Sequence, residues 1–143
     1  MTLLQGKQLN AFDKAVELIK KHEGYSRYLY YDANGYSIGY GTNLNDGISK
    51  EEALFLLKFR LRKIESKLKR HTWYNKLSVS RKIVLLDMAY NLGLPKLYKF
   101  KDFIWCLKHG YYHGASNRMK KSLWYKQTKN RAEYLIKLMY YGD

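Results

Sequence analysis

The sequence is poor in the residues that cross-link or interrupt a chain. Of its 143 residues, one is cysteine and one is proline. A single cysteine excludes an internal disulfide, so folding needs no oxidising compartment. Cys106 lies in an apolar run, residues 103–107, where a small buried side chain is expected rather than a reactive thiol. With one proline and no low-complexity tract, the sequence indicates no linker and no collagen-like or mucin-like segment.

Long apolar runs are also missing. No stretch approaches the roughly 18 apolar residues of a membrane-spanning helix. Residues 1–8 contain only a two-leucine cluster and lack the apolar region of a signal peptide. We therefore expect a soluble protein that is synthesised in the cytoplasm. Its 46% hydrophobic content is enough for a packed interior, and its length is typical of one domain.

Acidic residues are few. Asp and Glu number 12 against 27 Lys and Arg, which gives a formal net charge of +15. Such an excess predicts an anionic partner that is attracted over long range and in a salt-sensitive way. Nucleic acid, teichoic acids, lipopolysaccharide and other anionic wall polymers all satisfy this requirement, so charge alone does not choose among them.

The first part of the chain predicts a helix followed by a hairpin. Apolar residues recur at steps of three and four from Leu9 to Ile19, which predicts a helix over about 7–23 that ends at Gly24. Glu23 is the next step of this stripe, so we expect it to be partly desolvated. Aromatic and β-branched residues flank Asn34-Gly35 and predict a hairpin turn there.

Two glycines follow this turn. Gly39 and Gly41 are two apart and are expected on one face of the second strand. Without side chains at these positions, a ligand or another backbone can approach closely.

The remainder of the chain predicts helices. A capping box at Ser49–Glu52 opens a long helix over about 50–70, which spans roughly 30 Å. Further helices are expected over about 79–92, ending at Gly93 and Pro95, over 101–109, near 112–122, and over 129–141 with Thr128 as its cap. The sequence thus predicts an α+β fold, mostly helical, in one domain. Its expected parts are an N-terminal hairpin lobe (about 13–50), the linking helix, and a helical C-terminal lobe (71–143).

Glu23 and Asp32 form a candidate catalytic pair. They are nine residues apart, one at a helix end and one beside a hairpin turn, so both can face one cleft. Glycoside hydrolysis uses such a pair: one carboxyl protonates the leaving oxygen and an ionised carboxylate acts across the sugar. Ser37, on the opposing strand, is placed to orient a water molecule. Spacing alone nevertheless favours an ordinary helix-end glutamate and turn aspartate.

Three blocks of sequence add to this pattern. They are His22-Glu23-Gly24 with Tyr30-Tyr31-Asp32-Ala33-Asn34-Gly35-Tyr36-Ser37-Ile38-Gly39-Tyr40-Gly41, then Met88-Ala89-Tyr90-Asn91-Leu92-Gly93, then Ser122-Leu123-Trp124-Tyr125-Lys126-Gln127-Thr128-Lys129-Asn130-Arg131. In content and order they resemble the phage-type lysozymes, glycoside hydrolase family 24, which includes the T-even phage enzyme. The resemblance covers nearly the whole chain.

The resemblance implies a muramidase that cuts the β-1,4 bond between N-acetylmuramic acid and N-acetylglucosamine. Glu23 matches the general acid of the family, and Asp32 matches its second carboxylate, which acts as base or nucleophile. Ser37 stands where the family usually has a threonine that holds the attacking water, so the hydroxyl is kept. The resemblance favours inversion over retention.

Further residues gain a role only from the resemblance. Tyr90 and Asn91 match positions that line the sugar site, and Arg131 matches an arginine that pairs with the catalytic glutamate. Thr42 stands where several members of the family carry a histidine. The serine and asparagine that bind substrate in the T-even enzyme have no convincing match near Phe103 or Arg118, so neither role is carried over.

The resemblance also implies a setting. It suggests a lysozyme-like fold whose first helix packs on the C-terminal lobe, and an endolysin that waits in the host cytoplasm for a holin-type pore before it lyses the cell. Peptidoglycan is the expected partner, teichoic acids and lipopolysaccharide are further candidates, and a monomer without cofactor is expected. Nucleic acid is not expected, because no recognised fingerprint supports it.

Three alternatives remain open at this point. One is a wall-binding module of the same fold with weakened catalysis, and another is a lytic transglycosylase, which needs a glutamate but no water-holding aspartate. The third, a nucleic-acid binder, rests on charge alone. His109 and His113 have the spacing of metal-binding histidines, but Gly110 breaks the helix between them and no glutamate intervenes, so no metal site is expected.

Overall fold

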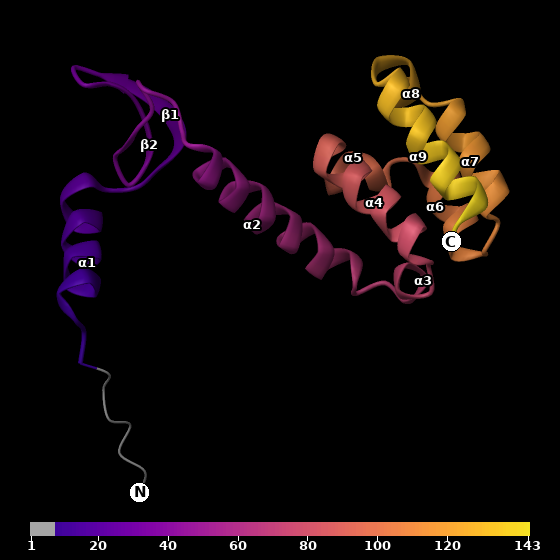
Figure 1. Ribbon diagram of the computed structural model, residues 1–143, viewed down its shortest axis with the longest axis horizontal. Helices are drawn as coiled ribbons and strands as arrows, with labels where there is room; N and C mark the ends of the chain where they lie inside the picture. The colour runs from indigo at the N-terminus through magenta and orange to yellow at the C-terminus, as the bar shows by residue number, and fades with distance from the viewer. Residues whose placement is uncertain (1–7) are drawn as a thin grey trace, which may run out of the picture. The chain divides into compact units, whose positions relative to one another are not determined.

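The computed structural model describes residues 8–143 (Figure 1). The chain forms two compact units, of which the first ends at Ala53 and the second covers Leu54–Asp143. The predicted α+β class is confirmed, since a small antiparallel sheet in the first unit is followed by helices. The expected lobe arrangement and the packing of the first helix stay predictions.

Helix α1 covers Ala11–Glu23. Its first turn is capped by Asn10, whose side-chain oxygen accepts a hydrogen bond of 2.9 Å from the Asp13 N–H. An asparagine cap satisfies a backbone donor that would otherwise lack a partner, so the helix starts there and not at the predicted residue 7, which lies outside the described residues. Gly24, with a φ of 68°, ends the helix as predicted.

The sheet has three antiparallel strands in the order β1-β2-β3: β1 Ser26–Asp32, β2 Gly35–Gly39 and β3 Thr42–Asn43. The predicted hairpin is confirmed, but Asp32 pairs with Gly35, so the turn residues are Ala33 and Asn34. The turn predicted at Asn34-Gly35 is therefore wrong by one residue. A type I′ turn needs positive φ at both central residues, and neither Ala33 nor Asn34 has it; Gly35, which follows the turn, has a φ of 98°.

Helix α2, Lys50–Leu68, begins with the predicted capping box. The Glu52 N–H donates to Ser49 Oγ and the Ser49 N–H donates to Glu52 Oε1, each at 3.1 Å. The two residues satisfy each other's donors, which fixes where the helix starts.

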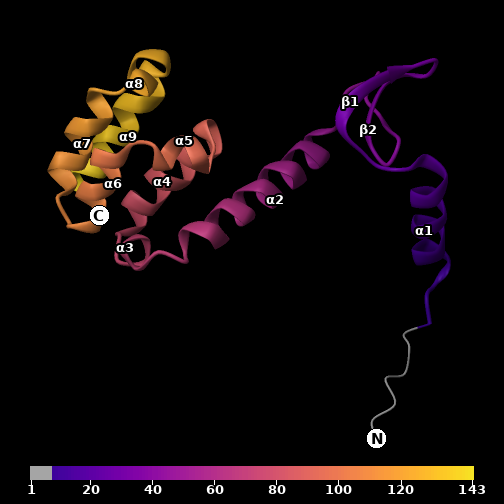
Figure 2. The same cartoon turned by 180° about the vertical axis from the view of Figure 1, so that it is seen from behind.

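The rest of the second unit is helical. Its further helices are α3 Thr72–Asn75, α4 Val79–Leu92, α5 Leu94–Tyr98, α6 Lys101–Lys108, α7 Tyr112–Lys120, α8 Leu123–Gln127 and α9 Lys129–Tyr141. Helix α7 packs against α6 and α9, and α9 also packs against α4, as both views show (Figure 2). Among residues 8–143, no helix has both the length and the apolar character that crossing a membrane requires.

Helix α4 has the predicted bounds, but two residues predicted as helix-end signals act differently. Pro95 does not end α4 but stands in the first turn of α5, where its missing N–H costs nothing. Thr128 occupies the N-cap position of α9, yet its hydroxyl does not cap that helix. It donates instead to the Trp124 carbonyl at 2.8 Å, closing the end of α8.

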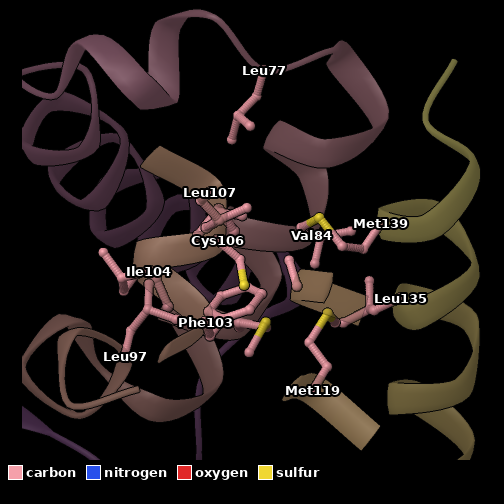
Figure 3. Packing of buried hydrophobic residues seen from close by; sticks show 14 of the residues in the cluster. Leu77, Val84, Leu97, Phe103, Ile104, Cys106, Leu107, Met119, Leu135 and Met139 are labelled. Carbon is pink, nitrogen blue, oxygen red and sulfur yellow. The ribbon is translucent and has the colours of Figure 1, made fainter. Parts of the chain in front are cut away.

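The hydrophobic core of the second unit joins its helices (Figure 3). It runs from Leu68 to Met139 and includes Val84, Phe103 and Leu107, each at most 2% exposed. Cys106 is a buried free thiol within it, which confirms the prediction of a packing role.

Candidate functional site

The carboxylate of Glu23 lies against the turn between β2 and β3. A Cβ placed on Gly41 would come within 2.5 Å of Glu23 Oε2, so the carboxylate occupies the space that any other residue at 41 would fill. Gly41 has a φ of 71° and lies in the turn after β2, not on the strand as predicted. At this glycine the close approach is made by the Glu23 side chain, whereas the space at Gly39 is open.

Asp32 ends β1 and helps to form the hairpin turn. Its Oδ1 accepts a hydrogen bond of 2.8 Å from the Asn34 N–H, an Asx turn that orients the carboxylate. The side chain is exposed, as expected for the ionised member of the pair.

Ser37 lies on the same face of the sheet as Asp32. In an antiparallel pair directly opposed residues share a face, and residues two apart along a strand share it too. Asp32 opposes Gly35, so Ser37, two residues further on, belongs to this face. Ser37 is 5% exposed and lies in the central strand, between Tyr30 on β1 and Asn43 on β3.

Two asparagines missed in the sequence hold the hairpin turn. The carbonyl of Asn34 accepts hydrogen bonds from Asn43 Nδ2 at 2.9 Å and from Asn45 Nδ2 at 2.5 Å. Asn45 Oδ1 also accepts from the Tyr36 N–H, and its amide fills the space where Gly35 lacks a side chain. In the sequence, the signal for this network is that several Asn and Asp residues follow Gly41. Such residues often form hydrogen bonds from their side chains to the backbone.

Within the first unit the expected desolvation of Glu23 is not seen, and because the packing of α1 on the C-terminal lobe stays a prediction, so does this desolvation. The side chain is exposed, and no residue of α1 is buried. The apolar stripe formed as a helix face, but that face meets no core within the first unit. Glu23 is therefore positioned by the glycine turn rather than by burial.

Tyr90, Asn91 and Arg131 belong to the second unit. Tyr90 and Asn91 stand at the end of α4 and are exposed. Tyr90 and Arg131 line one hollow of about 460 Å³, whose other lining residues are Leu57, Leu61, Ile83, Leu86 and Asp87. The Arg131 guanidinium donates from Nε to Asp87 Oδ1, an exposed ion pair of the kind that contributes little stability.

The two histidines with metal-like spacing lie on different elements. His109 follows the end of α6 and stacks on Trp105, while His113 lies in α7 and stacks on Tyr140. Within residues 8–143, no three His, Cys, Asp or Glu side chains gather closely enough to hold a metal ion.

Comparison with known proteins finds similar sequences over most of the chain. The family model described as phage lysozyme matches residues 20–137. The chain is 25% identical to the pre-baseplate central spike protein Gp5 of Enterobacteria phage T4, over 89% of this chain and 28% of that protein. It is 30% identical to a probable T4-type lysozyme 1 of Dictyostelium discoideum, over 66% of this chain and 56% of that protein. The chain thus spans about half or less of these relatives.

Proposed function

The chain belongs to the phage lysozyme family, and on this basis we propose that it is a muramidase. Its substrate is the glycan strand of peptidoglycan, in which it hydrolyses the β-1,4 bond between N-acetylmuramic acid and N-acetylglucosamine.

One observation carries the proposal. The carboxylate of Glu23, from the end of α1, lies against Gly41 in the turn between β2 and β3, and Asp32 ends β1 of the same sheet. Two carboxyl groups from different elements are thus tied to one small sheet, and both are exposed. A glycosidic bond held over this sheet can receive a proton from one carboxyl while the other acts on the sugar.

Each residue then has a defined step. Glu23 gives its proton to the leaving glycosidic oxygen as the C–O bond breaks. In the inverting course Asp32 takes a proton from a water molecule, oriented by the Ser37 hydroxyl, as the water oxygen bonds to the anomeric carbon. In the retaining course Asp32 itself forms that bond and water later displaces it. A carboxyl separation of about 6.5–9.5 Å in a sugar complex supports inversion, and about 5 Å supports retention.

The family match also supports roles for three residues of the second unit. We assign Tyr90 and Asn91 to the sugar, one through its aromatic face and the other through its amide. Arg131 is assigned a supporting role. The support for these three roles is the family match, which includes their positions.

The setting follows from the family and the charge. As an endolysin the protein waits in the host cytoplasm and reaches the wall through a holin-type pore, which makes it bacteriolytic. Its net charge of +15 favours wall polymers such as teichoic acids, or lipopolysaccharide, as further contacts. We propose that it acts as a monomer and without a cofactor.

The decisive test replaces the proposed acid. Glu23→Gln keeps the size of the side chain but has no proton to donate, so turnover of purified peptidoglycan should fall by roughly 10²- to 10⁴-fold. The measurement is the release of reducing ends, with mass spectrometry of the products. Glu17→Gln is the matched control, because Glu17 is an exposed glutamate of the same helix. It should leave the rate unchanged.

Each rival function predicts a different result. Near-normal lysis by Glu23→Gln would show that Glu23 is not the acid. Anhydro-muramic ends in the products of the unmodified protein would identify a transglycosylase. Wall binding without release of reducing ends would leave a binding module, and DNA retardation at physiological salt without lysis would identify a nucleic-acid binder.

A further inference from the structure

Trp105 is left at the surface of the second unit. The other two tryptophans, Trp73 and Trp124, are 8% and 2% exposed, whereas Trp105 is 53% exposed. It lies on α6, whose opposite face contributes Phe103 and Leu107 to the core. Packing of α6 therefore does not require an indole at this position, and tryptophan is enriched at binding surfaces because it joins a large apolar ring to a polar N–H.

Two further rings stack on this indole. The ring centroid of His109 is 4.2 Å from that of Trp105, and the centroid of Tyr111 is 5.6 Å away, with interplanar angles of 26° and 23°. The His109 and Tyr111 rings are 6.3 Å apart and nearly parallel. Aromatic carbons do not approach closer than about 3.5 Å, so rings on opposite faces of the indole would be at least about 7 Å apart. Both rings therefore lie on one face and leave the other uncovered by either of them, in keeping with the 53% exposure of Trp105.

This stack is held in place by the backbone. His109 Nδ1 lies 2.9 Å from the Trp105 carbonyl oxygen and donates to it, which fixes the imidazole ring. Gly110, with a φ of 73°, then turns the chain so that Tyr111 returns to the indole. We call Trp105, His109 and Tyr111 the aromatic shelf.

A polar hollow adjoins the aromatic shelf and shares Tyr111 with it. Its volume is about 280 Å³, close to the lower end of the range for small-ligand sites. Its lining residues are Arg81, Gly110, Tyr111, Tyr112, His113 and Gly114. No atom lies within 4 Å of the Cβ position at Gly110, so the backbone there is open to a ligand.

The polar groups of the hollow are already oriented. The Arg81 guanidinium donates from Nε to the Met139 carbonyl and from Nη2 to the Tyr140 carbonyl, and it lies over the Tyr112 ring at 4.0 Å. The His113 ring stacks on Tyr140 at 3.9 Å. A ligand would therefore meet side chains whose positions are already fixed, which lowers the entropic cost of binding.

Because Tyr111 lies on the covered side of the indole, the other indole face and the hollow fit neighbouring parts of a polysaccharide. A pyranose has a flat C–H face that packs on the negative face of an indole, and an edge of hydroxyl and acetamido groups that needs polar partners. A nucleobase also stacks on aromatic rings, but its phosphates need free cations. Of the residues lining the hollow, the one cation is Arg81, and two of its N–H groups are bonded to backbone carbonyls. The hollow therefore suits a neutral sugar better than a phosphate.

We propose that the aromatic shelf and its hollow form a second, non-catalytic site that binds neighbouring parts of the glycan strand. The identity of the glycan rests on the proposed function. Because this site lies on the same chain as the catalytic carboxylates, an enzyme held there stays close to the insoluble wall after each cleavage. The result is a higher effective concentration of substrate on the wall.

The experiment measures binding and not turnover. Glu23→Gln protein is pelleted with purified peptidoglycan sacculi stripped of teichoic acid, alone and with Trp105→Ala. Loss of the open indole should weaken binding roughly tenfold, and Trp105→Tyr should restore part of it. The matched control is Tyr134→Ala, which removes a 64% exposed aromatic ring from α9 and should leave binding unchanged. Since both residues are exposed, the melting temperature should change little in either variant.

A second probe locates the contact. A soluble N-acetylglucosamine tetramer added to the Glu23→Gln protein should shift the NMR signal of the Trp105 indole N–H and leave those of Trp73 and Trp124 in place. Equal pelleting of the Trp105→Ala and Tyr134→Ala variants would overturn the proposal. The proposal would also be overturned if Trp105→Ala weakened binding of a single-stranded oligonucleotide but left binding of sacculi unchanged. That result would assign the aromatic shelf to nucleic acid.

Failure of the two proposals can be told apart. If Glu23→Gln still cleaves peptidoglycan, the proposed acid is wrong, but the tetramer and pelleting readouts on Trp105 are unaffected. If the Glu23→Gln protein cleaves nothing and does not pellet with sacculi at all, the second glycan site is overturned while the role of Glu23 stands.

Discussion

At the scale of single residues, Gly41 sets where the Glu23 carboxylate can lie. A methyl group at position 41 would come within 2.5 Å of Glu23 Oε2, and the φ of 71° strains any other residue. In Gly41→Ala the flexible carboxylate should move aside rather than the backbone. Because a displacement of about 1 Å at a reacting group can cost on the order of 10²-fold in rate, kcat on peptidoglycan should fall by that order while KM changes little.

Gly39→Ala is the matched control for this prediction. Gly39 has a φ of 68°, almost the same as that of Gly41, but no atom lies within 4 Å of its Cβ position. Both variants should lose similar stability, about 1–2 kcal/mol from the left-handed conformation, and their melting temperatures check this. If Gly39→Ala loses as much kcat as Gly41→Ala, backbone strain and not the position of Glu23 explains the loss.

From the sequence, the candidate catalytic residues of this site could be identified better than the residues that hold them in place. Glu23, Asp32 and Ser37 stood out because the residues around them resemble a family. Their burial did not follow from the helix pattern, since α1 has an apolar face yet no buried residue. Asn43 and Asn45 could not be predicted, because they act by bonding to a carbonyl nine and eleven residues away in sequence.

At the scale of elements, the start of α4 and the end of α9 are joined by two side chains of opposite charge, Asp143 and Arg81. Asp143 accepts hydrogen bonds of 2.8 Å from the Val79 and Ser80 N–H groups at the start of α4. In return, Arg81 of α4 donates to the carbonyls of residues 139 and 140 at the end of α9. Each charge thus lies at the helix end that it stabilises, and each satisfies backbone groups that the helices leave unpaired.

This contact predicts a loss of stability in acid. The Ser80 hydroxyl and backbone N–H, with smaller effects from Val79 and Arg81, lower the pKa of the Asp143 carboxyl below its usual 3.8. A group whose pKa is lower in the folded state stabilises the fold above the unfolded pKa and loses this effect as pH falls through the folded pKa. Asp143→Ala should therefore melt at a lower temperature at pH 7, and the difference should shrink below about pH 4.

Asp143→Asn separates the contribution of the hydrogen bonds from that of the ionised carboxylate. It keeps one oxygen that can accept from α4 but cannot titrate, so it should retain part of the stability at pH 7 and show no extra loss in acid. Thermal melts of the three proteins from pH 7 to pH 3 measure this. A difference between the unmodified protein and Asp143→Ala that is the same at every pH would contradict a role for the ionised carboxylate.

Elements with a visible start or stop were predictable. The capping box of α2 and both ends of α4 agree with the sequence pattern. Helices α3, α5 and α8 have only four or five residues, too few for a helical period to repeat, and they were missed. The hairpin turn was displaced by one residue because Asn-Gly predicts a type I′ turn, whereas here the glycine follows the turn.

At the scale of the whole molecule, the net charge is +15, and the basic residues that produce it are not spread evenly over the hollows of the second unit. One hollow of about 420 Å³ is rich in cations; its lining residues are Lys99, Phe100, Lys101, Asp102, Phe103, Arg118, Lys121 and Ser122. Asp102 is the one acidic residue in that lining. Cations gathered around a concave surface raise the local concentration of an anionic polymer more than the same charges spread over a convex one.

Reversing charge at this hollow should weaken wall binding in a salt-dependent way. In Arg118→Glu with Lys121→Glu, binding to wall fragments that carry teichoic acid should be several-fold weaker at about 10 mM salt. Near 1 M salt it should equal that of the unmodified protein, because the Debye length falls from about 30 Å to about 3 Å. The control, Lys129→Glu with Lys137→Glu, changes net charge by the same amount on α9. The two double variants have the same net charge, so a local site would make their wall binding differ. An equal loss of binding in both would show that net charge, and not this hollow, attracts the wall.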